Sequence, residues 1–214
     1  MIPSVPSSSG FAVVDVETTG LDPRTDRIVQ IGVVSLDRQG YNQGEWVSLV
    51  QPGRPMGATF VHGLTAQDVR EVPSFTALIP QLEELLSGRA VVAHNAPFDV
   101  SFLNAAFERA SYPFAIPAQA TVCTMELSKI YLPEGRHSLP AAAERAGIQL
   151  TEHHRALADA RAAAGLLQHY LQEEAKGNHY AEHAIARDGR VWKPAAWEGA
   201  LRAAIDISWP EPLF

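Results

Sequence analysis

Apolar residues gather in two kinds of run along the chain, and the first kind is typical of β-strands. Three runs rich in valine and isoleucine come early, and turn-forming glycine, aspartate and proline separate the first run from the second. The second and third runs flank a short polar segment, which indicates a hairpin. The strands predicted from all such runs cover residues 11–16, 27–36, 45–50, 90–93 and 120–123.

The second kind of run has apolar residues three and four positions apart, which is typical of amphipathic helices. Ser74 is a suitable N-cap for one of these helices, and Gly88 is a suitable stop. The predicted helices cover residues 64–69, 74–86, 99–110, 125–131, 138–146, 155–175 and 195–205. Three strands in a meander, followed by strands that alternate with helices, predict an α/β sheet with mixed strand directions.

The length of 214 residues fits one domain with an appendage. Residues 1–9 are rich in proline and serine, so we expect a disordered lead-in. Residues 10–176 carry nearly all the predicted elements and form the main domain. Residues 177–214 hold three of the four tryptophans, Trp192, Trp197 and Trp209, and are interpreted as a C-terminal extension.

Charge and cysteine content exclude several classes of protein. The formal net charge of −7 argues against a broad, charge-driven coat on duplex nucleic acid, although a metal-assisted site stays open because a bound cation reverses the local sign. A single cysteine, Cys123, excludes a disulfide framework and a multi-cysteine zinc site, and it suits a reducing compartment. No apolar run approaches the roughly 18 residues of a membrane helix, and the start of the chain lacks a secretory pattern. We therefore expect a cytoplasmic protein with no membrane association.

Two carboxylates stand at the end of the first predicted strand. Asp15 and Glu17 are two positions apart, so their side chains share a face of the strand. Two carboxylates beside an apolar core cannot both stay charged and unpaired, and a divalent cation with oxygen ligands resolves the conflict. The alternative is a solvated strand end in which Thr18 and Thr19 cap a turn.

Two further clusters contain acidic residues. Asp99 directly follows the strand at 90–93, where ligand sites of open α/β sheets collect, although it could serve only as a helix cap. Asp159 lies five residues after His154, which is about 140° on a continuous helix, so the two converge only if His154 lies in the preceding loop. The neighbouring His153 competes for the same role, and spacing alone does not separate the two histidines.

The three clusters together predict a two-metal nuclease site. Phosphodiester hydrolysis needs an activated water and a stabilised leaving oxygen, and two cations about 3.5–4 Å apart supply both. Four carboxylates balance the charge of two such ions. A histidine, with an ordinary pKa near 6.5, can take the proton from the attacking water.

Four stretches of the chain form a recognisable set of motifs: VVDVETTGLDP at 13–23, VHGLT at 61–65, VVAHNAPFDVSFL at 91–103 and HRALADA at 154–160. Together they resemble the DEDDh family of 3′–5′ exonucleases, with the strongest likeness to the bacterial DNA polymerase III epsilon (proofreading) subunits. The likeness runs through residues 10–172 in the same order and makes residues 10–176 an exonuclease domain. It implies a ribonuclease H-like fold with a mixed five-stranded sheet, three antiparallel strands followed by two parallel ones, flanked by helices.

The resemblance also implies roles for single residues. Asp15, Glu17 and Asp159 would bind two Mg²⁺ or Mn²⁺ ions directly, with Asp99 completing the set and His154 as the general base. Thr18 and its neighbours would offer backbone groups to the terminal 3′-hydroxyl, and Leu21 would wedge against the last base. The nucleotide pocket would be lined by His62, Asn95, Phe98 and Phe102. For Leu21 and Phe102 the alternative is ordinary core packing.

The resemblance thus predicts a hydrolase that releases nucleoside 5′-monophosphates from the 3′ end of single-stranded or frayed DNA, in replication, proofreading or repair. Two alternatives stay open: an exoribonuclease of the same superfamily, and a module that binds nucleic acid without cutting. The extension does not match a polymerase-binding tail, which favours a stand-alone enzyme over a polymerase partner. The tail at 209–214 ends in Leu-Phe, as do peptides that dock on the sliding clamp, but packing on the domain is the favoured interpretation.

Overall fold

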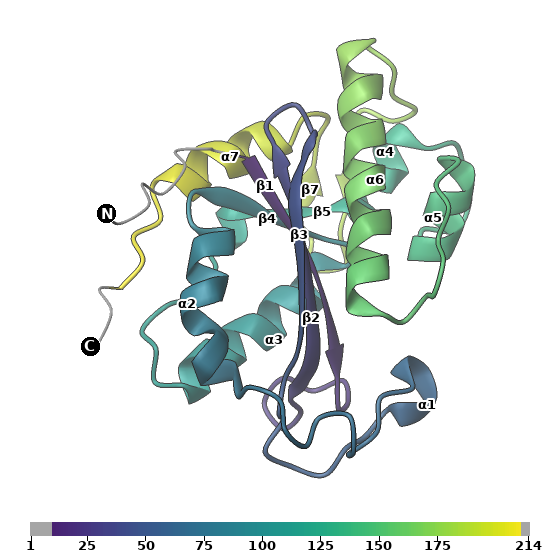
Figure 1. The fold of residues 1–214 in the computed structure, drawn as a ribbon. Helices are drawn as coiled ribbons and strands as arrows, with labels where there is room; N and C mark the ends of the chain where they lie inside the picture. The colour runs from purple at the N-terminus through teal and green to yellow at the C-terminus, as the bar shows by residue number, and fades with distance from the viewer. Residues whose placement is uncertain (1–9, 211–214) are drawn as a thin grey trace.

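A five-stranded mixed sheet forms the centre of the molecule in the computed structural model, which describes residues 10–210 (Figure 1). The strand order is β3-β2-β1-β4-β5; β1 pairs antiparallel with β2, and β2 with β3, whereas β4 and β5 run parallel to β1. The strands are β1 (Gly10–Thr18), β2 (Ile28–Asp37), β3 (Asn42–Leu49), β4 (Arg89–Ala93) and β5 (Thr121–Cys123). The predicted fold, three antiparallel strands followed by two parallel ones, is confirmed.

Helices cover both faces of this sheet. One face carries α2 (Phe75–Leu86) and α3 (Ala96–Arg109), and the other carries α4 (Thr124–Tyr131), α5 (Leu139–Arg145) and α6 (Ala156–Ala175) (Figure 1). Alternate residues of β1 enter two different cores, because successive side chains of a strand point to opposite faces. Val14 and Val16 pack with α2 and α3, while Phe11 and Val13 pack with α6. Asp15 and Glu17 follow the second series and face α6.

The segment between β3 and α2 differs from its prediction. Residues 64–69, predicted as a helix, form a run of turns in which Asp68 accepts hydrogen bonds from both the backbone N–H and the hydroxyl of Thr65, each at 2.7 Å. The helix of this segment is instead the single turn α1 (Thr59–His62). The apolar spacing at 64–69 arises because Leu64 and Val69 pack with Val29 in a small separate cluster.

The C-terminal extension packs on the domain. A short hairpin, β6 (Ala184–Ile185) with β7 (Val191–Trp192), follows α6 and was not predicted. Helix α7 (Trp197–Ile205) starts two residues later than predicted and adds Trp197, Leu201 and Ala204 to the core built around α6. The boundary at residue 176 stays a prediction, although burial of α7 ties the extension to the sheet.

The ends of the chain limit two other expectations. The lead-in at 1–9 and most of the proposed docking tail, residues 211–214, lie outside the described residues. Trp209 lies within them, and its ring stacks on Phe114 with 3.7 Å between centroids. Across the described part of the chain, the helices are too short or too polar to span a bilayer.

Candidate active site

Carboxylates from three elements meet at the carboxyl end of β1. Oxygen atoms of Asp15 and Glu17 on β1 and of Asp159 on α6 all lie within 4.8 Å of one another. Asp99, in the first turn of α3, is almost fully buried beside them, and its Oδ1 accepts a hydrogen bond of 3.1 Å from the backbone N–H of Val16. The structure therefore brings together the four acidic residues that the sequence singled out.

Residues opposite these acids on β2 allow α6 to approach the sheet. Gly32 pairs with Asp15 in the β1–β2 register, and a Cβ atom at position 32 would lie 2.5 Å from the backbone of Ala156. Gln30, opposite Glu17, accepts a hydrogen bond of 3.0 Å from the backbone N–H of Ala156 at the start of α6. Because Gly32 has no side chain and Gln30 binds the start of α6, Asp159 lies next to Asp15.

The electrostatics of the cluster are those of a site that needs cations. Burial raises the pKa of Asp15 well above its usual range, and repulsion from Asp99, Asp159 and Glu17 adds to the effect. Burial also raises the pKa of Glu17 to about 7, with a further contribution from Asp159. For Asp99, burial raises the pKa to about 8, although the hydrogen bond from Val16 opposes the shift. A set of hard oxygen donors that repel one another fits divalent cations such as Mg²⁺ or Mn²⁺.

Two histidines lie against Asp159. Nδ1 of His153 is 2.9 Å from Oδ1 of Asp159, and the backbone N–H of His154 donates to Oδ2 of the same carboxylate at 3.1 Å. The two imidazole rings stack with 3.8 Å between centroids, and His154 adopts a positive φ of 68°. His154 precedes α6, as convergence with Asp159 requires, but its hydrogen bond to the carboxylate comes from the backbone, whereas that of His153 comes from the ring. The choice between them as the general base stays a prediction.

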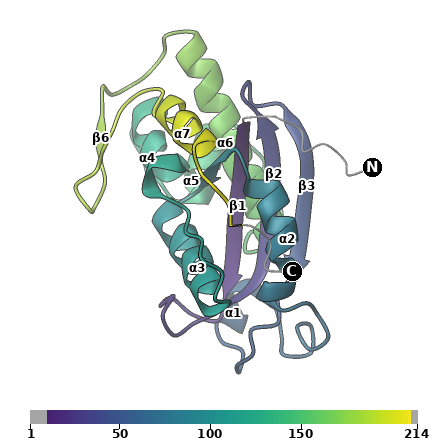
Figure 2. The same cartoon turned by 90° about the vertical axis from the view of Figure 1, so that its left-hand side faces the viewer.

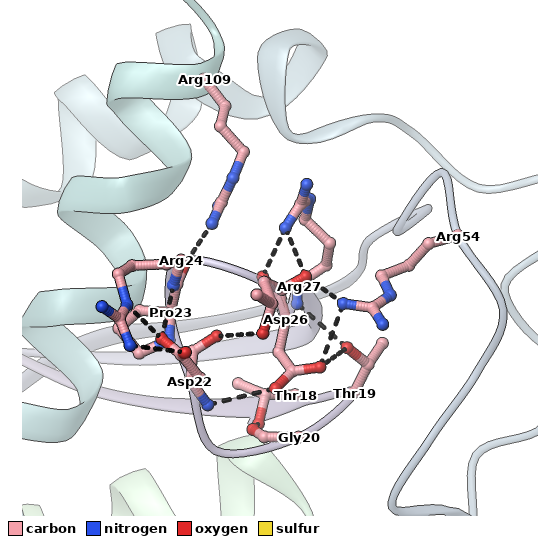
Figure 3. Close-up of polar contacts among 11 residues, drawn as sticks. Thr18, Thr19, Gly20, Asp22, Pro23, Arg24, Asp26, Arg27, Arg54 and Arg109 are labelled. Carbon is pink, nitrogen blue, oxygen red and sulfur yellow. Dashed lines mark hydrogen bonds and ion pairs between the residues drawn. The ribbon is translucent and has the colours of Figure 1, made fainter.

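The end of β1 and the loop that follows it, residues 18–27, are held by distant parts of the chain (Figure 3). The Thr18 hydroxyl donates to the carbonyl of Gly20 at 2.6 Å. Arg54 donates to the carbonyl of Thr25 and Arg109 donates to that of Pro23, so both guanidinium groups converge on the loop. Leu21, which belongs to this loop, is 83% exposed and therefore does not pack in the core.

The proposed nucleotide-contacting residues fall into exposed and buried groups. Asn95 is exposed at the start of α3, and Phe98 is half-buried. Phe102 is fully buried, and its ring centroid lies 4.9 Å from that of Phe98. Phe102 therefore packs in the core against Phe98, which is the alternative that the sequence left open, and its contact with a nucleotide stays a prediction.

His62 has an unused polar atom. Its ring is 3% exposed, and Nδ1 accepts a hydrogen bond of 3.0 Å from the backbone N–H of Leu64, which leaves Nε2 to carry the proton. Within the described residues, Nε2 has no hydrogen-bond partner. Burial lowers the pKa of His62, so the neutral ring is favoured. The backbone of Gly57 and of Thr18 opposes this shift of the pKa, so both lie near the ring, and a bound oxygen atom in better geometry would satisfy Nε2–H.

Three residues that shape the site were missed by the sequence analysis. Gly32 interrupts a run of β-branched residues, and a glycine in a strand is a known signal of close backbone approach. Gln30 and Arg54 give no such signal, because their partners at residues 156 and 25 are defined only by the folded chain.

Comparison with known proteins agrees with this geometry. The family model RNase_T, described as "Exonuclease", matches residues 12–167, which contain all four acidic residues and both histidines. The chain therefore belongs to this exonuclease family, and the resemblance stated from its motifs is confirmed at that level.

Individual relatives place the chain within the family. It is 34% identical over 175 residues to the PolC-type DNA polymerase III of Oceanobacillus iheyensis, and 33% identical over 180 residues to that of Bacillus subtilis. Each match covers 79% of this chain but only 12% of the polymerase, so the chain corresponds to a small part of these relatives. The fold resembles E. coli Exonuclease I in complex with a dT13 oligonucleotide, with a TM-score of 0.69 and 21% identity over 78% of this chain and 42% of the other.

Proposed function

We propose that this chain is a metal-dependent 3′–5′ exonuclease of the DEDDh type that acts on single-stranded or frayed DNA and releases nucleoside 5′-monophosphates. The observation that carries the proposal is the meeting of the carboxylates of Asp15, Glu17 and Asp159 within 4.8 Å of one another, beside Asp99. Membership of the exonuclease family supports the reaction class.

Each residue of the site has a task in this mechanism. Asp15, Glu17 and Asp159 would hold two Mg²⁺ or Mn²⁺ ions, with Asp99 completing the set through water. Bound there, the two ions would activate the attacking water and stabilise the leaving oxygen. His154 would take the proton from that water, since its loop lies against Asp159.

Binding of the 3′ end would use the residues around the cluster. Backbone groups at Thr18 would contact the terminal hydroxyl, and the exposed Leu21 side chain would pack against the last base. Nε2–H of His62 would donate to a substrate oxygen, which supplies its missing partner. Asn95 and Phe98 would line the nucleotide pocket, because aromatic faces accept any base.

The choice of DNA rests on the relatives. The curated relatives are named as DNA polymerases, and a solved neighbour holds a dT13 oligonucleotide. A polymerase or a sliding clamp as partner is a further proposal, because the chain matches only 12% of the polymerases. The net charge of −7 agrees with a frayed end, which needs few phosphate contacts.

Digestion of matched DNA and RNA oligonucleotides, labelled at the 5′ or the 3′ end, tests the proposal. With Mg²⁺ or Mn²⁺ we expect stepwise shortening from the 3′ end of DNA, and none with EDTA. Asp15→Asn should lose at least about a thousandfold in rate, because a metal ligand supplies several kcal/mol of transition-state stabilisation. A strong preference for RNA would identify the chain as an exoribonuclease. If neither DNA nor RNA is cleaved, the alternative of a module that binds nucleic acid without cutting would be favoured.

A pair of variants tests the general base. His154→Ala should abolish most of the activity, and added imidazole should restore part of it. His153→Ala is the matched control, since it removes the neighbouring ring from the same loop, and it should cost less than about tenfold. The reverse order of the two losses would assign the proton transfer to His153.

A further inference from the structure

The β6–β7 hairpin of the extension and the exonuclease domain enclose a cavity of about 480 Å³. Its domain side contains Asn95, Pro97 and Cys123, and its hairpin side contains Arg187 and Arg190. Figure 2 shows this hairpin extending beside α4 at the edge of the molecule. The volume lies within the range of roughly 300–1,000 Å³ that small-molecule sites occupy in proteins.

Positive charge on the hairpin is available to a ligand. Residues 184–193 hold three basic side chains and one acidic side chain in a chain whose net charge is −7. Arg187 is exposed, and within residues 10–210 no hydrogen bond or ion pair engages its side chain. Of the two acids of the cavity wall, Glu126 forms an ion pair with Lys129 at 2.5 Å, and Asp188 accepts a hydrogen bond from the neutral backbone N–H of Arg190 at 3.0 Å. The two arginines therefore exceed the one acid that has no cationic partner.

Arg190 is held in place over the ring of Trp192, which is itself almost fully buried. Its guanidinium carbon lies 4.2 Å from the ring centroid of Trp192, and the same group donates to the carbonyl of Ala118 at 3.1 Å. Guanidinium planes and aromatic rings are the surfaces on which unpaired bases stack. Apolar groups such as Pro97 and Met125 form much of the remaining wall and carry no sequence preference.

The cavity lies next to the candidate active site. Cys123 on β5 pairs with Ala93 on β4, and Asn95 follows two residues later, so the cavity lies at the carboxyl ends of these strands. The four carboxylates lie at the carboxyl end of β1, which runs parallel to β4 in the same sheet. Asn95 lines the cavity and directly precedes the first turn of α3, which carries Asp99. One helical turn therefore separates the cavity from the carboxylate cluster.

We propose that this cavity binds the part of the nucleic-acid strand that lies on the 5′ side of the last two nucleotides. Arg187 contacts its phosphates, and a base stacks on the exposed guanidinium plane of Arg190, which Trp192 supports from the core side. The inference rests on the proposed exonuclease function and gives the extension a task, which is to hold long single strands during repeated cleavage. Unpaired positive charge and continuity with the active site favour this occupant over an acidic peptide.

Equilibrium binding separates this role from catalysis. Fluorescence anisotropy of labelled oligothymidylates in EDTA would compare a dinucleotide with a strand of about 20 nucleotides. Arg187→Glu is the principal variant, because its side chain has no partner to lose, and Arg190→Ala is the second. Arg202→Glu is the matched control, since Arg202 is an exposed arginine on α7 with Glu198 at 3.9 Å as its nearest acid.

We expect Arg187→Glu to weaken binding of the long strand at least about tenfold and to reduce the dependence of affinity on salt, because fewer counterions are released. Its kcat and KM for the dinucleotide in Mn²⁺ should equal those of the wild type, and Arg202→Glu should change neither substrate. The cavity proposal would be overturned if Arg187→Glu left the affinity for the long strand unchanged, or if it lowered the affinity for both substrates equally. Either result would leave the exonuclease function intact, provided that the wild type cleaves. A wild type that cleaves nothing would overturn that function first.

Discussion

At the scale of single residues, the main feature is a group of carboxylates that the fold forces together. Burial and mutual repulsion raise the pKa values of Asp15, Glu17 and Asp99. A protein would not gain stability from such a cluster, since each negative charge costs free energy in the metal-free state. Its presence beside two histidines agrees with a site selected for cation binding and hydrolysis.

The sign of these shifts predicts how the metal-free protein responds to pH. A carboxyl group with a raised pKa binds its proton more tightly in the folded chain than in the unfolded chain. The folded state is therefore favoured at low pH, and this contribution is lost as pH rises through about 7 for Glu17 and about 8 for Asp99. In EDTA, the melting temperature should fall between pH 5 and pH 8.

Added Mn²⁺ should raise the melting temperature more at pH 8 than at pH 5, because protons and cations compete for the same oxygens. Thermal unfolding followed by circular dichroism measures both effects. Asp99→Asn, which removes one of the raised groups, serves as the control and should make the pH dependence in EDTA shallower. A melting temperature that rises steadily to pH 8 without metal would contradict the electrostatic account.

At the scale of elements, the approach of α6 to β2 decides whether the site forms. Gly32→Ala would place a methyl group about 2.5 Å from the backbone of Ala156 and push the start of α6 outward. We expect a loss of about 1–3 kcal/mol in the free energy of unfolding. Activity should fall about a hundredfold, because a displacement near 1 Å is enough to misplace Asp159.

Gly199→Ala is the matched control for this variant. Gly199 lies within α7, and a Cβ atom there would meet no neighbour within 4 Å. The same substitution should leave activity unchanged and stabilise the helix by up to about 1 kcal/mol. Oligonucleotide cleavage and urea unfolding of both variants would check the pair; equal activities would show that the spacing of α6 does not govern the site.

Element types were largely predictable, and the exceptions have physical causes. The strands of the sheet and α6 follow from local apolar patterns. The sequence also predicted that Asp15 and Glu17 stand at the end of the first strand, where the structure has them. The helix predicted at 64–69 was wrong because the apolar residues there, which pack around Val29, have the spacing of a helix. The β6–β7 hairpin has two residues per strand and contains no alternation long enough to detect.

At the scale of the whole molecule, the extension and the exonuclease domain share one core. Trp197 and Leu201 of α7 are almost fully buried, and they lie in the same apolar cluster as Val122 of β5. Each large apolar side chain contributes about 1.5–3 kcal/mol on burial, while a domain as a whole is stable by only about 5–15 kcal/mol. Packing between residues so distant in sequence could not be read from the local pattern, which favoured a boundary near Gly177.

A chain that ends at residue 176 should therefore fail to fold cooperatively, even though it retains all four carboxylates. We expect exposed apolar surface, measured by dye binding, and a broad thermal transition. A chain that ends at residue 210 keeps every described element and should unfold as the full chain does. A sharp, unshifted transition for the shorter chain would establish residues 10–176 as an independent domain.

The distance in sequence between Asp15 and Asp159 has a consequence for the order of folding. Nearly the whole exonuclease region must be assembled before the two carboxylates meet, so the repulsion between them develops late, near the native state. A cation that relieves this repulsion stabilises the finished protein far more than the folding transition state. Divalent metal should therefore lower the rate of unfolding and leave the rate of folding nearly unchanged.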